Sequence, residues 1–549
     1  MMAAKKKPSR RTEPPEEPKP AQQPTGVGEQ PSEGPTRPVD AAHVQLKPKR
    51  QGQLLDTGIE GLNDILHGGL PPNRLYLVEG NPGSGKTTLA LQFLLAGVRR
   101  GEPCLFVTLS ESEEELKTSA AAHGWSLEGI RVLELIASEE SLEPDARYTM
   151  FHPSEVELTR TIRVVLEETR RLKPRRVVFD SLAELRLLAE SPLRYRRQVL
   201  ALKQFFSPQQ CTVLLIDDRT GEDRDQQLQT IANGVLSLEA GLPDYGRMRR
   251  RLHVAKLRGT DFREGYHDYV IRQAGLEVFP RLVAAEHRTV HSSEVVKSGL
   301  EPLDALLGGG LARGTSTLMI GAAGTGKSSL ATQFAITAGR RQEHAALFLF
   351  DESVATFLKR SDGLGMGATA MVASGQLSVR QIDAAELSVG EFAHVIRRSV
   401  EQKNTRLVVI DSVNGYLNAM PEQRSLKLHL HELLAYLGEL DVTTLLVMCQ
   451  HGVMGENYET PVDVTYLADT VLLLRYFEAA GEIRQAISVI KKRTGKHERT
   501  IRDLAFQDAG IMIGQPLREF RGIMTGTPQY VGTAYPGEKP STYPHGNRE

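Results

Sequence analysis

Two glycine-rich loops carry the residue types and the spacing that bind the phosphates of a nucleotide. In each loop a lysine and a hydroxyl residue, Lys86-Thr87 and Lys327-Ser328, stand between a short apolar run and a helix-forming stretch. Glycines let backbone N–H groups surround the phosphates, the lysine reaches the β- and γ-phosphates, and the hydroxyl can ligate Mg²⁺. Both loops match the Walker A pattern, so we predict two nucleotide sites. The first comprises Gly80, Asn81, Pro82, Gly83, Ser84, Gly85, Lys86, Thr87 and Thr88, and the second comprises Gly321, Ala322, Ala323, Gly324, Thr325, Gly326, Lys327, Ser328 and Ser329.

An aspartate closes an apolar run in each half of the chain, at Asp180 and at Asp411, and a serine follows each one. A Walker B element needs such an aspartate to hold Mg²⁺ through a water molecule. The alternative is an ordinary helix N-cap, but the recurrence downstream of both Walker A loops favours the metal role. We therefore predict Thr87, Asp180, Ser328 and Asp411 as the magnesium ligands.

Acidic residues also follow the second apolar run of each half. The first half has Ser110-Glu111 and the second has Asp351-Glu352. Parallel α/β sheets place catalytic groups at the carboxyl ends of their strands, so we predict that Glu111, Asp351 and Glu352 orient or deprotonate the attacking water. An exposed acidic turn is the alternative. Because one half has a single carboxylate and the other has two, the two sites should contribute unequally to turnover.

Basic residues recur near the end of each half, as Lys256 and Arg258 and as Lys491 and Arg493, each time after an alternating strand pattern. They come too late in the chain to belong to the phosphate loop of their own half. We predict that they reach the γ-phosphate bound by a neighbouring subunit, a contribution that can raise a rate by about 10³ to 10⁵. The alternative is a solvated strand end.

These motifs recur in the same order, and equivalent landmarks lie between 231 and 241 residues apart, which indicates a duplicated domain. Short β-branched runs alternate with amphipathic stretches, a pattern typical of a mainly parallel α/β sheet covered on both faces. We predict helices that start near Leu89 and Leu330, after the glycine-rich loops. The predicted strands are Leu75–Val78, Leu105–Thr108, Val177–Phe179, Val213–Ile216, Leu318–Ile320, Leu347–Phe350, Leu407–Ile410 and Leu445–Met448.

Proline-rich sequence with few core residues flanks the repeat and predicts flexible tails. The predicted divisions are a disordered tail over residues 1–47, a first domain over 48–288, a second domain over 289–528 and a flexible tail over 529–549.

The composition excludes several classes of protein. The 549 residues carry 67 Lys and Arg against 68 Asp and Glu, so the formal net charge of −1 provides no global attraction to nucleic acid or acidic lipid. No apolar stretch approaches the roughly 18 residues that span a bilayer. Cys104, Cys211 and Cys449 lie far apart, in or beside apolar runs, as reduced core residues do. We predict a soluble, cytoplasmic protein with no membrane partner.

The arrangement resembles the KaiC family of tandem RecA-like ATPases, and the resemblance covers about residues 48 to 528. It is carried by the Gly-Gly-Leu leaders, the two Walker A loops, the acidic pairs, the two Lys-x-Arg elements and the stretch 468–476. The resemblance implies two tandem RecA-like P-loop domains, ATP and Mg²⁺ as cofactors, and a homohexameric double ring with ATP between subunits. It also implies slow hydrolysis in the first ring, Ser/Thr autokinase and autophosphatase chemistry in the second, and a KaiB-like, response-regulator or histidine-kinase protein as signalling partner.

Some positions depart from the family pattern. Ser110 and Asp351 occupy the place of a glutamate beside the catalytic Glu111 and Glu352. Thr465-Tyr466 stands where clock members carry an adjacent Ser-Thr acceptor pair. We therefore predict Thr465 as the candidate phosphoacceptor, with a structural loop threonine as the alternative, and we expect no ordered two-site phosphorylation cycle. The short C-terminal tail leaves little room for the partner-binding peptide of clock members.

Two other functions stay open. One is a RecA-type DNA-dependent ATPase, which the fold and the arginines of residues 247–251 would suit, although the net charge and the lack of an aromatic-basic loop oppose it. We expect those arginines at a ring interface or in solvent and expect no nucleic-acid partner. The other function is a nucleotide-switched binding scaffold with negligible turnover. Two further segments should carry no chemistry: residues 429–432 should form a polar helix face, and residues 363–367 should form a loop.

Overall fold

The computed structural model describes residues 54–135, 153–189, 191–218, 226–243, 245–287, 292–418, 423–450, 464–507, 510–525 and 527–532. The tail predicted over residues 1–47 lies outside these ranges. Residues from Gly52 onward belong to one compact unit. None of the helices in the described ranges has both the length and the apolar character needed to cross a bilayer.

The first domain is built on a sheet in the strand order β3-β2-β4-β5-β1-β6-β7-β8-β9. The strands from β3 to β6 are parallel, and β7 to β9 extend the sheet in antiparallel fashion. The strands are β1 (Leu75–Gly80), β2 (Cys104–Thr108), β3 (Ile130–Glu134), β4 (Arg176–Asp180), β5 (Thr212–Asp218), β6 (Gly234–Gly241), β7 (Arg249–Leu257), β8 (His267–Arg272) and β9 (Gly275–Phe279).

The second domain repeats this topology, with the strand order β14-β13-β15-β16-β12-β17-β18-β19-β20. The predictions of a duplication and of a mainly parallel sheet are therefore confirmed, and each predicted strand run falls within or overlaps an observed strand. The strands are β12 (Ser316–Gly321), β13 (His344–Leu349), β14 (Leu377–Gln381), β15 (Thr405–Asp411), β16 (Thr443–Cys449), β17 (Thr470–Ala479), β18 (Glu482–Lys492), β19 (Ile501–Gln507) and β20 (Gly510–Pro516). A short pair, β10 (Val295–Val296) and β11 (Leu311–Ala312), precedes this sheet.

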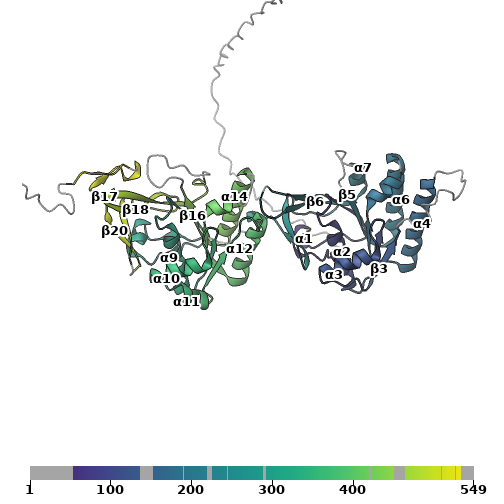
Figure 1. The fold of residues 1–549 in the computed structure, drawn as a ribbon, viewed down its shortest axis with the longest axis horizontal. Helices are drawn as coiled ribbons and strands as arrows, with labels where there is room; N and C mark the ends of the chain where they lie inside the picture. Colours follow the sequence, from purple (N-terminus) through teal and green to yellow (C-terminus); the bar gives the residue numbers. More distant parts are fainter. Residues whose placement is uncertain are drawn as a thin grey trace, which may run out of the picture. The chain divides into compact units, whose positions relative to one another are not determined.

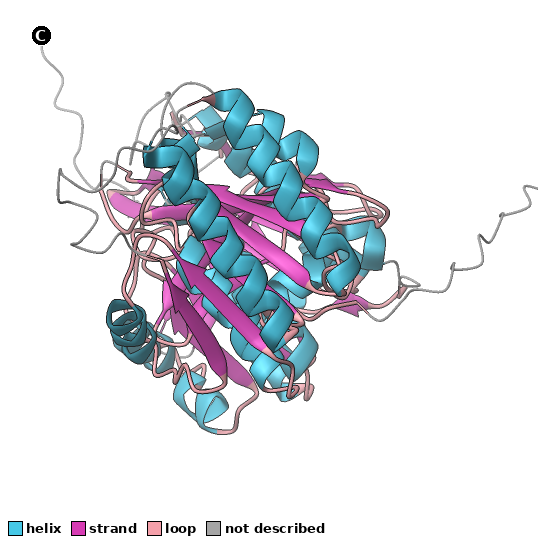
Figure 2. Ribbon diagram, turned by 90° about the vertical axis from the view of Figure 1, so that its right-hand side faces the viewer, coloured by secondary structure: helices cyan, strands magenta, loops and turns pink. Residues whose placement is uncertain are grey.

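Helices cover both faces of each sheet, because neighbouring strand residues alternate between two apolar cores. In the first domain Tyr76 and Val78 pack with α1, α2 and α3, whereas Leu75 and Leu77 pack with α4 to α7. Figures 1 and 2 show the helices alongside the strands. The helices of this domain are α1 (Glu60–Ile65), α2 (Lys86–Val98), α3 (Glu113–Ala122), α4 (Pro153–Leu172), α5 (Leu182–Ala189), α6 (Pro192–Phe206) and α7 (Gln226–Ile231).

The second domain divides its core in the same way. Met319 faces α8 to α11, and Leu318 and Ile320 face α12 to α14. These helices are α8 (Glu301–Leu306), α9 (Lys327–Arg340), α10 (Val354–Gly363), α11 (Ala368–Ala373), α12 (Val389–Lys403), α13 (Val413–Asn418) and α14 (Gln423–Glu439).

Two boundaries differ from the predictions. Helices α2 and α9 begin at the loop lysines, three residues before the predicted starts, because a glycine with φ of 91° turns the chain directly into each helix. The tail predicted from residue 529 begins with a strand, β22 (Gln529–Tyr530), which pairs with β21 (Phe520–Arg521). Residues 533–549 lie outside the described ranges.

The three cysteines and two short segments agree with the predictions in part. The three cysteines carry free thiols, and Cys104 and Cys211 are buried as predicted, whereas Cys449 is only half-buried. Residues 364–367 form the connection between α10 and α11, as predicted for this loop, and residues 429–432 lie within α14.

Candidate functional site

Each glycine-rich loop joins the central strand of its sheet, β1 or β12, to the helix that follows. The last loop glycines, Gly85 and Gly326, have left-handed backbones with φ of 91°. A Cβ atom on Gly85 would lie 2.5 Å from Ile271, and one on Gly326 would lie 1.9 Å from Phe506. Both loops therefore require glycine at this point, for backbone conformation and for space.

The lysine of the first loop is buried and fully engaged. The Lys86 ammonium donates hydrogen bonds to the carbonyls of Gly80 and Asn81, both at 3.0 Å, and forms a 2.7 Å ion pair with Asp218 at the end of β5. No sequence motif marks Asp218. Its contact arises because β5 lies beside β1, with Asp218 level with Gly80.

The structure brings the predicted magnesium ligands of the first domain together. The hydroxyl of Thr87 donates a 2.8 Å hydrogen bond to the Asp180 carboxylate. Burial raises the pKa of Asp180 to about 6, although the Thr87 hydrogen bond opposes the shift. One hydroxyl and one carboxylate fit a Mg²⁺ ion that takes its other ligands from water and substrate phosphates.

The second domain forms an equivalent arrangement. Lys327 donates to the carbonyl of Ala322 at 2.6 Å, and burial lowers the pKa of its ammonium. The hydroxyl of Ser328 hydrogen-bonds the Asp411 carboxylate, whose pKa is raised by burial. These oxygen donors also fit Mg²⁺.

The candidate water-activating carboxylates differ between the domains. Glu111 follows β2, and burial together with nearby Glu115 raises the pKa of its carboxyl group. Among the ion pairs of the described residues, none involves Glu111. A carboxylate with a raised pKa and no cation beside it is a stronger base toward water.

Both acidic residues of the second domain are held by other side chains. Arg360 on α10 grips Glu352 with two nitrogens, at 3.2 and 2.9 Å, and Asp351 accepts a 2.5 Å hydrogen bond from Ser412. Arg360 also donates to Ser329 in the first turn of α9, at 2.9 Å. Sequence reasoning identified the acidic pair but missed Arg360, which no motif indicates.

The Lys-x-Arg elements lie away from the phosphate loop of their own domain. Lys256 on β7 is level with Leu77 of β1, and Lys491 on β18 is level with Leu318 of β12. Each of these positions is three residues before the loop, so the lysine lies about 10 Å back along the strand direction. Arg258 lies further in that direction. These residues occupy the edge of the sheet opposite their own phosphate site.

The basic residues of the second element bind the segment that carries the candidate phosphoacceptor. The Lys491 ammonium donates to the carbonyls of Thr465 and Ala468 at 3.0 and 2.7 Å, and Arg493 donates to the Tyr466 carbonyl at 2.8 Å. Thr465 is half-buried, whereas Tyr466 is exposed. In the first domain Lys256 makes comparable contacts to the backbone that ends α7.

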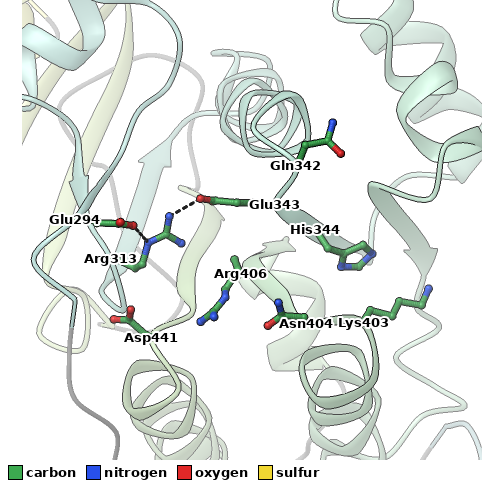
Figure 3. A pocket seen from close by; sticks show the side chains of 9 residues that line it. All are labelled: Glu294, Arg313, Gln342, Glu343, His344, Lys403, Asn404, Arg406 and Asp441. Carbon is green, nitrogen blue, oxygen red and sulfur yellow. Dashed lines mark hydrogen bonds and ion pairs between the residues drawn. The ribbon is translucent and has the colours of Figure 1, made fainter.

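A polar cavity of about 330 Å³ lies at the amino ends of β12, β13, β15 and β16, the edge opposite the second phosphate loop (Figure 3). Glu294 and Glu343 point toward Arg313 and pair with it, at 3.3 and 2.7 Å. No residue of the phosphate loop lines it, so this cavity is separate from the nucleotide site. It is lined by Glu294, Arg313, Gln342, Glu343, His344, Lys403, Asn404, Arg406 and Asp441.

Part of the arginine run at 247–251 binds the second domain. Arg249 donates to the carbonyls of Ala384 and Ala385, and the backbone N–H of Arg247 donates to Ala385 at 3.1 Å. The sequence prediction placed these residues at a ring interface or in solvent. In the structure, Arg247 and Arg249 contact the second half of the same chain.

Two parallel sheets, each with a phosphate loop after its central strand and a carboxylate beside the loop hydroxyl, define a tandem RecA-like P-loop ATPase. The family model for the KaiC ATPase matches residues 55–283 and again residues 296–518. The chain belongs to the KaiC ATPase family, so the resemblance found in the sequence is confirmed.

Relatives match nearly the whole chain. The circadian clock oscillator protein KaiC of Thermostichus vulcanus is 29% identical over 484 residues, which cover 87% of this chain and 92% of that protein. The corresponding protein of Prochlorococcus marinus is 29% identical over 498 residues, covering 89% and 97%. The circadian clock protein KaiC3 of Synechocystis is 28% identical over 489 residues, covering 87% and 95%.

Proposed function

We propose that this protein is an ATP-hydrolysing regulator that assembles into a homohexameric double ring and binds Mg²⁺·ATP at both phosphate loops. The position of the Lys-x-Arg elements carries this proposal. Each element lies at the sheet edge opposite its own loop, so its cations have a use in catalysis only at the site of a neighbouring copy. Closed rings of identical subunits satisfy such a head-to-tail contact.

In the first domain Lys86 and the loop N–H groups hold the phosphates, and Thr87 and Asp180 are the residues that would hold Mg²⁺. When bound, Mg²⁺ neutralises charge on the phosphoryl group that is transferred. Glu111 accepts a proton from the attacking water. Arg258 of the adjacent copy stabilises the transferred group from the opposite side.

We expect ATP hydrolysis to be slower in the second domain than in the first. Arg360 contacts both oxygens of Glu352, and Ser412 donates to one oxygen of Asp351, so the ion pair with Arg360 must loosen before Glu352 takes a proton. We propose that its γ-phosphoryl group goes in part to Thr465. The Thr465 oxygen attacks the γ-phosphorus, the bond to the ADP oxygen breaks, and the hydroxyl proton passes to Glu352.

Assembly is tested by sizing the full chain with and without ATP and Mg²⁺. ATP should convert smaller species to a hexamer, because the bound nucleotide joins adjacent subunits. Replacing both arginines, Arg258→Ala and Arg493→Ala, should reduce turnover while nucleotide binding persists. A chain that stays monomeric at saturating nucleotide contradicts the ring.

Phosphorylation is tested by incubating the chain with ATP and locating phosphate by mass spectrometry. We expect phosphate on Thr465 and none on Tyr466, since a site shaped for an aliphatic hydroxyl differs in reach and acidity from one for a phenol. Glu352→Gln should abolish the label. Unlabelled Thr465 in a chain that still hydrolyses ATP would restrict the protein to ATPase activity.

The same ATPase assay separates the two other functions. Stimulation by single-stranded DNA would support a DNA-dependent motor, and nucleotide binding without phosphate release would support a switched scaffold. We expect neither outcome, because Arg247 and Arg249 contact the second half of the same chain and the raised pKa of Glu111 suits a base toward water.

A further inference from the structure

The two loop lysines meet different side chains at one equivalent position. In the first sheet Gly80 of β1 is level with Asp218, the last residue of β5. In the second sheet Gly321 of β12 is level with Cys449, the last residue of β16. Since β5 and β16 hold the same place in the two sheets, Asp218 and Cys449 are structural equivalents.

The contacts made by Lys86 leave no donor for a phosphate. A lysine ammonium has three N–H donors, and those of Lys86 are matched by the carbonyls of Gly80 and Asn81 and by the Asp218 carboxylate. The Lys86 side chain is 8% exposed and that of Asp218 is 31% exposed, so the ion pair is only partly screened by water. A bound phosphate must displace one of these acceptors, and Asp218 is the charged one.

At the equivalent position Lys327 meets Cys449 in place of a carboxylate, and the Asp411 carboxylate, the counterpart of Asp180, is also near it. The Lys327 ammonium meets the Ala322 carbonyl and the thiol of Cys449. Among the ion pairs of the described residues, none involves Lys327. A neutral thiol is a weak hydrogen-bond acceptor, so it yields the lysine to a phosphate at little cost.

The surrounding residues add to this contrast. Next to Asp218 and Gly80, the first domain buries two further carboxylates, Asp217 and Glu79, which are level with each other. The equivalent residues of the second domain are Met448 and Ile320. Asp217 pairs with Arg186, and Glu79 accepts from Gln229. Two further buried carboxylates therefore lie beside the first loop, at positions where the second domain has apolar side chains.

We propose that Asp218 is a positioning residue that competes with nucleotide phosphates for Lys86 and thereby weakens nucleotide binding at the first site relative to the second. The proposal rests on the proposed function only in that both loops bind nucleotide. It attributes the difference in nucleotide affinity between the two sites to one structural position, which is Asp218 in the first domain and Cys449 in the second.

The test uses full-length chains in which one loop is disabled by Lys327→Met or by Lys86→Met, and it measures binding of a fluorescent ATP analogue with Mg²⁺. In the Lys327→Met chain, Asp218→Asn should lower the dissociation constant about tenfold. In the Lys86→Met chain, Cys449→Asp should raise it about tenfold. Asp218→Glu keeps the charge and should stay close to the parent chain.

Two readouts separate competition for Lys86 from a structural role. A gain in affinity cannot come from a damaged fold, and the reciprocal change at Cys449 tests the same contact in the other domain. The gain should also appear for ADP and not for AMP, because the lysine reaches only the β- and γ-phosphates. A dissociation constant for Asp218→Asn that equals or exceeds that of the parent would overturn the proposal. Loss of all nucleotide binding in both single-loop parents would instead overturn the proposed function.

Discussion

Replacing Arg360 by glutamine should accelerate ATP hydrolysis at the second site. Arg360 holds both oxygens of Glu352, at 3.2 and 2.9 Å, so this carboxylate must leave the pair before it can accept a proton from water. Glutamine keeps the first carbons of the side chain but removes the charge, the two-pronged grip and, because it is shorter, the contact with Ser329.

The size of the effect follows from the exposure of the pair. The side chains of Arg360 and Glu352 are 27% and 22% exposed, so the interaction is stronger than that of a surface pair but remains screened. Exposed pairs contribute up to about 1 kcal/mol, and we take about this value for opening the contact. Removing that cost should raise the rate of the chemical step about fivefold.

The assay is phosphate release from a chain that carries Glu111→Gln, which leaves the first site able to bind ATP and unable to activate water. Ser329→Ala is the comparison for the lost 2.9 Å contact between Arg360 and the first turn of α9, and because Ser329 belongs to the predicted nucleotide site, ATP affinity is measured alongside turnover. Arg360→Lys, which keeps the charge without the fork, should give an intermediate rate. Turnover that is unchanged or slower in Arg360→Gln, with Ser329→Ala at the parental rate, would show that Arg360 supports catalysis and does not restrain it.

Three further results are expected. Because burial raises the pKa of Asp180 to about 6 and only its ionised form holds Mg²⁺, affinity for Mg²⁺·ATP at the first site should fall as the pH drops through about 6, and titrations of Asp180→Asn should lack this pH dependence. Gly326→Ala should abolish nucleotide binding at the second site, since its Cβ would meet Phe506 at 1.9 Å, and Phe506→Ala in the same chain should restore little because the left-handed backbone remains strained. Arg176→Met should lower the free energy of unfolding of the first domain by about 3 kcal/mol in urea titrations, because the fully buried guanidinium pairs with Glu102 at 2.6 Å and donates to the Asp56 and Phe93 carbonyls; Glu102→Gln, which leaves the buried guanidinium without its counter-charge, is the matched comparison and should also destabilise the domain.

The chemistry of the phosphate loops could be predicted from the sequence because it is local. Glycines, lysine and hydroxyl act within one loop. The recurrence of Asp180 and Asp411 after apolar runs indicated strands that end beside the phosphate loop. Thr87 meets Asp180 across 93 positions of sequence, yet both motifs are recognisable separately. Duplication helped further, since each motif had a second copy.

The residues that distinguish the two sites could not be predicted in this way. Asp218 contacts Lys86 only because β5 lies next to β1, and the register that makes Asp218 level with Gly80 depends on the packing of whole strands. Arg360 reaches Glu352 from a later turn of α10, at a spacing that corresponds to no local motif. Strand order and side-chain reach belong to tertiary structure, where sequence patterns carry little information.

The residue differences between the two domains affect nucleotide binding and ATP hydrolysis in opposite directions. At the first site Asp218 forms an ion pair with the lysine, whereas no ion pair of the described residues involves Glu111. At the second site no ion pair of the described residues involves Lys327, whereas Arg360 pairs with Glu352. A restrained lysine weakens the hold on nucleotide, and an available base speeds its hydrolysis, so the first site should turn ATP over and release the product. The second site should bind more tightly and hydrolyse more slowly. A nucleotide retained with its γ-phosphate intact remains available to an acceptor other than water, and the contact between Lys491 and the Thr465 carbonyl places the candidate acceptor beside the cations that would enter a neighbour's site.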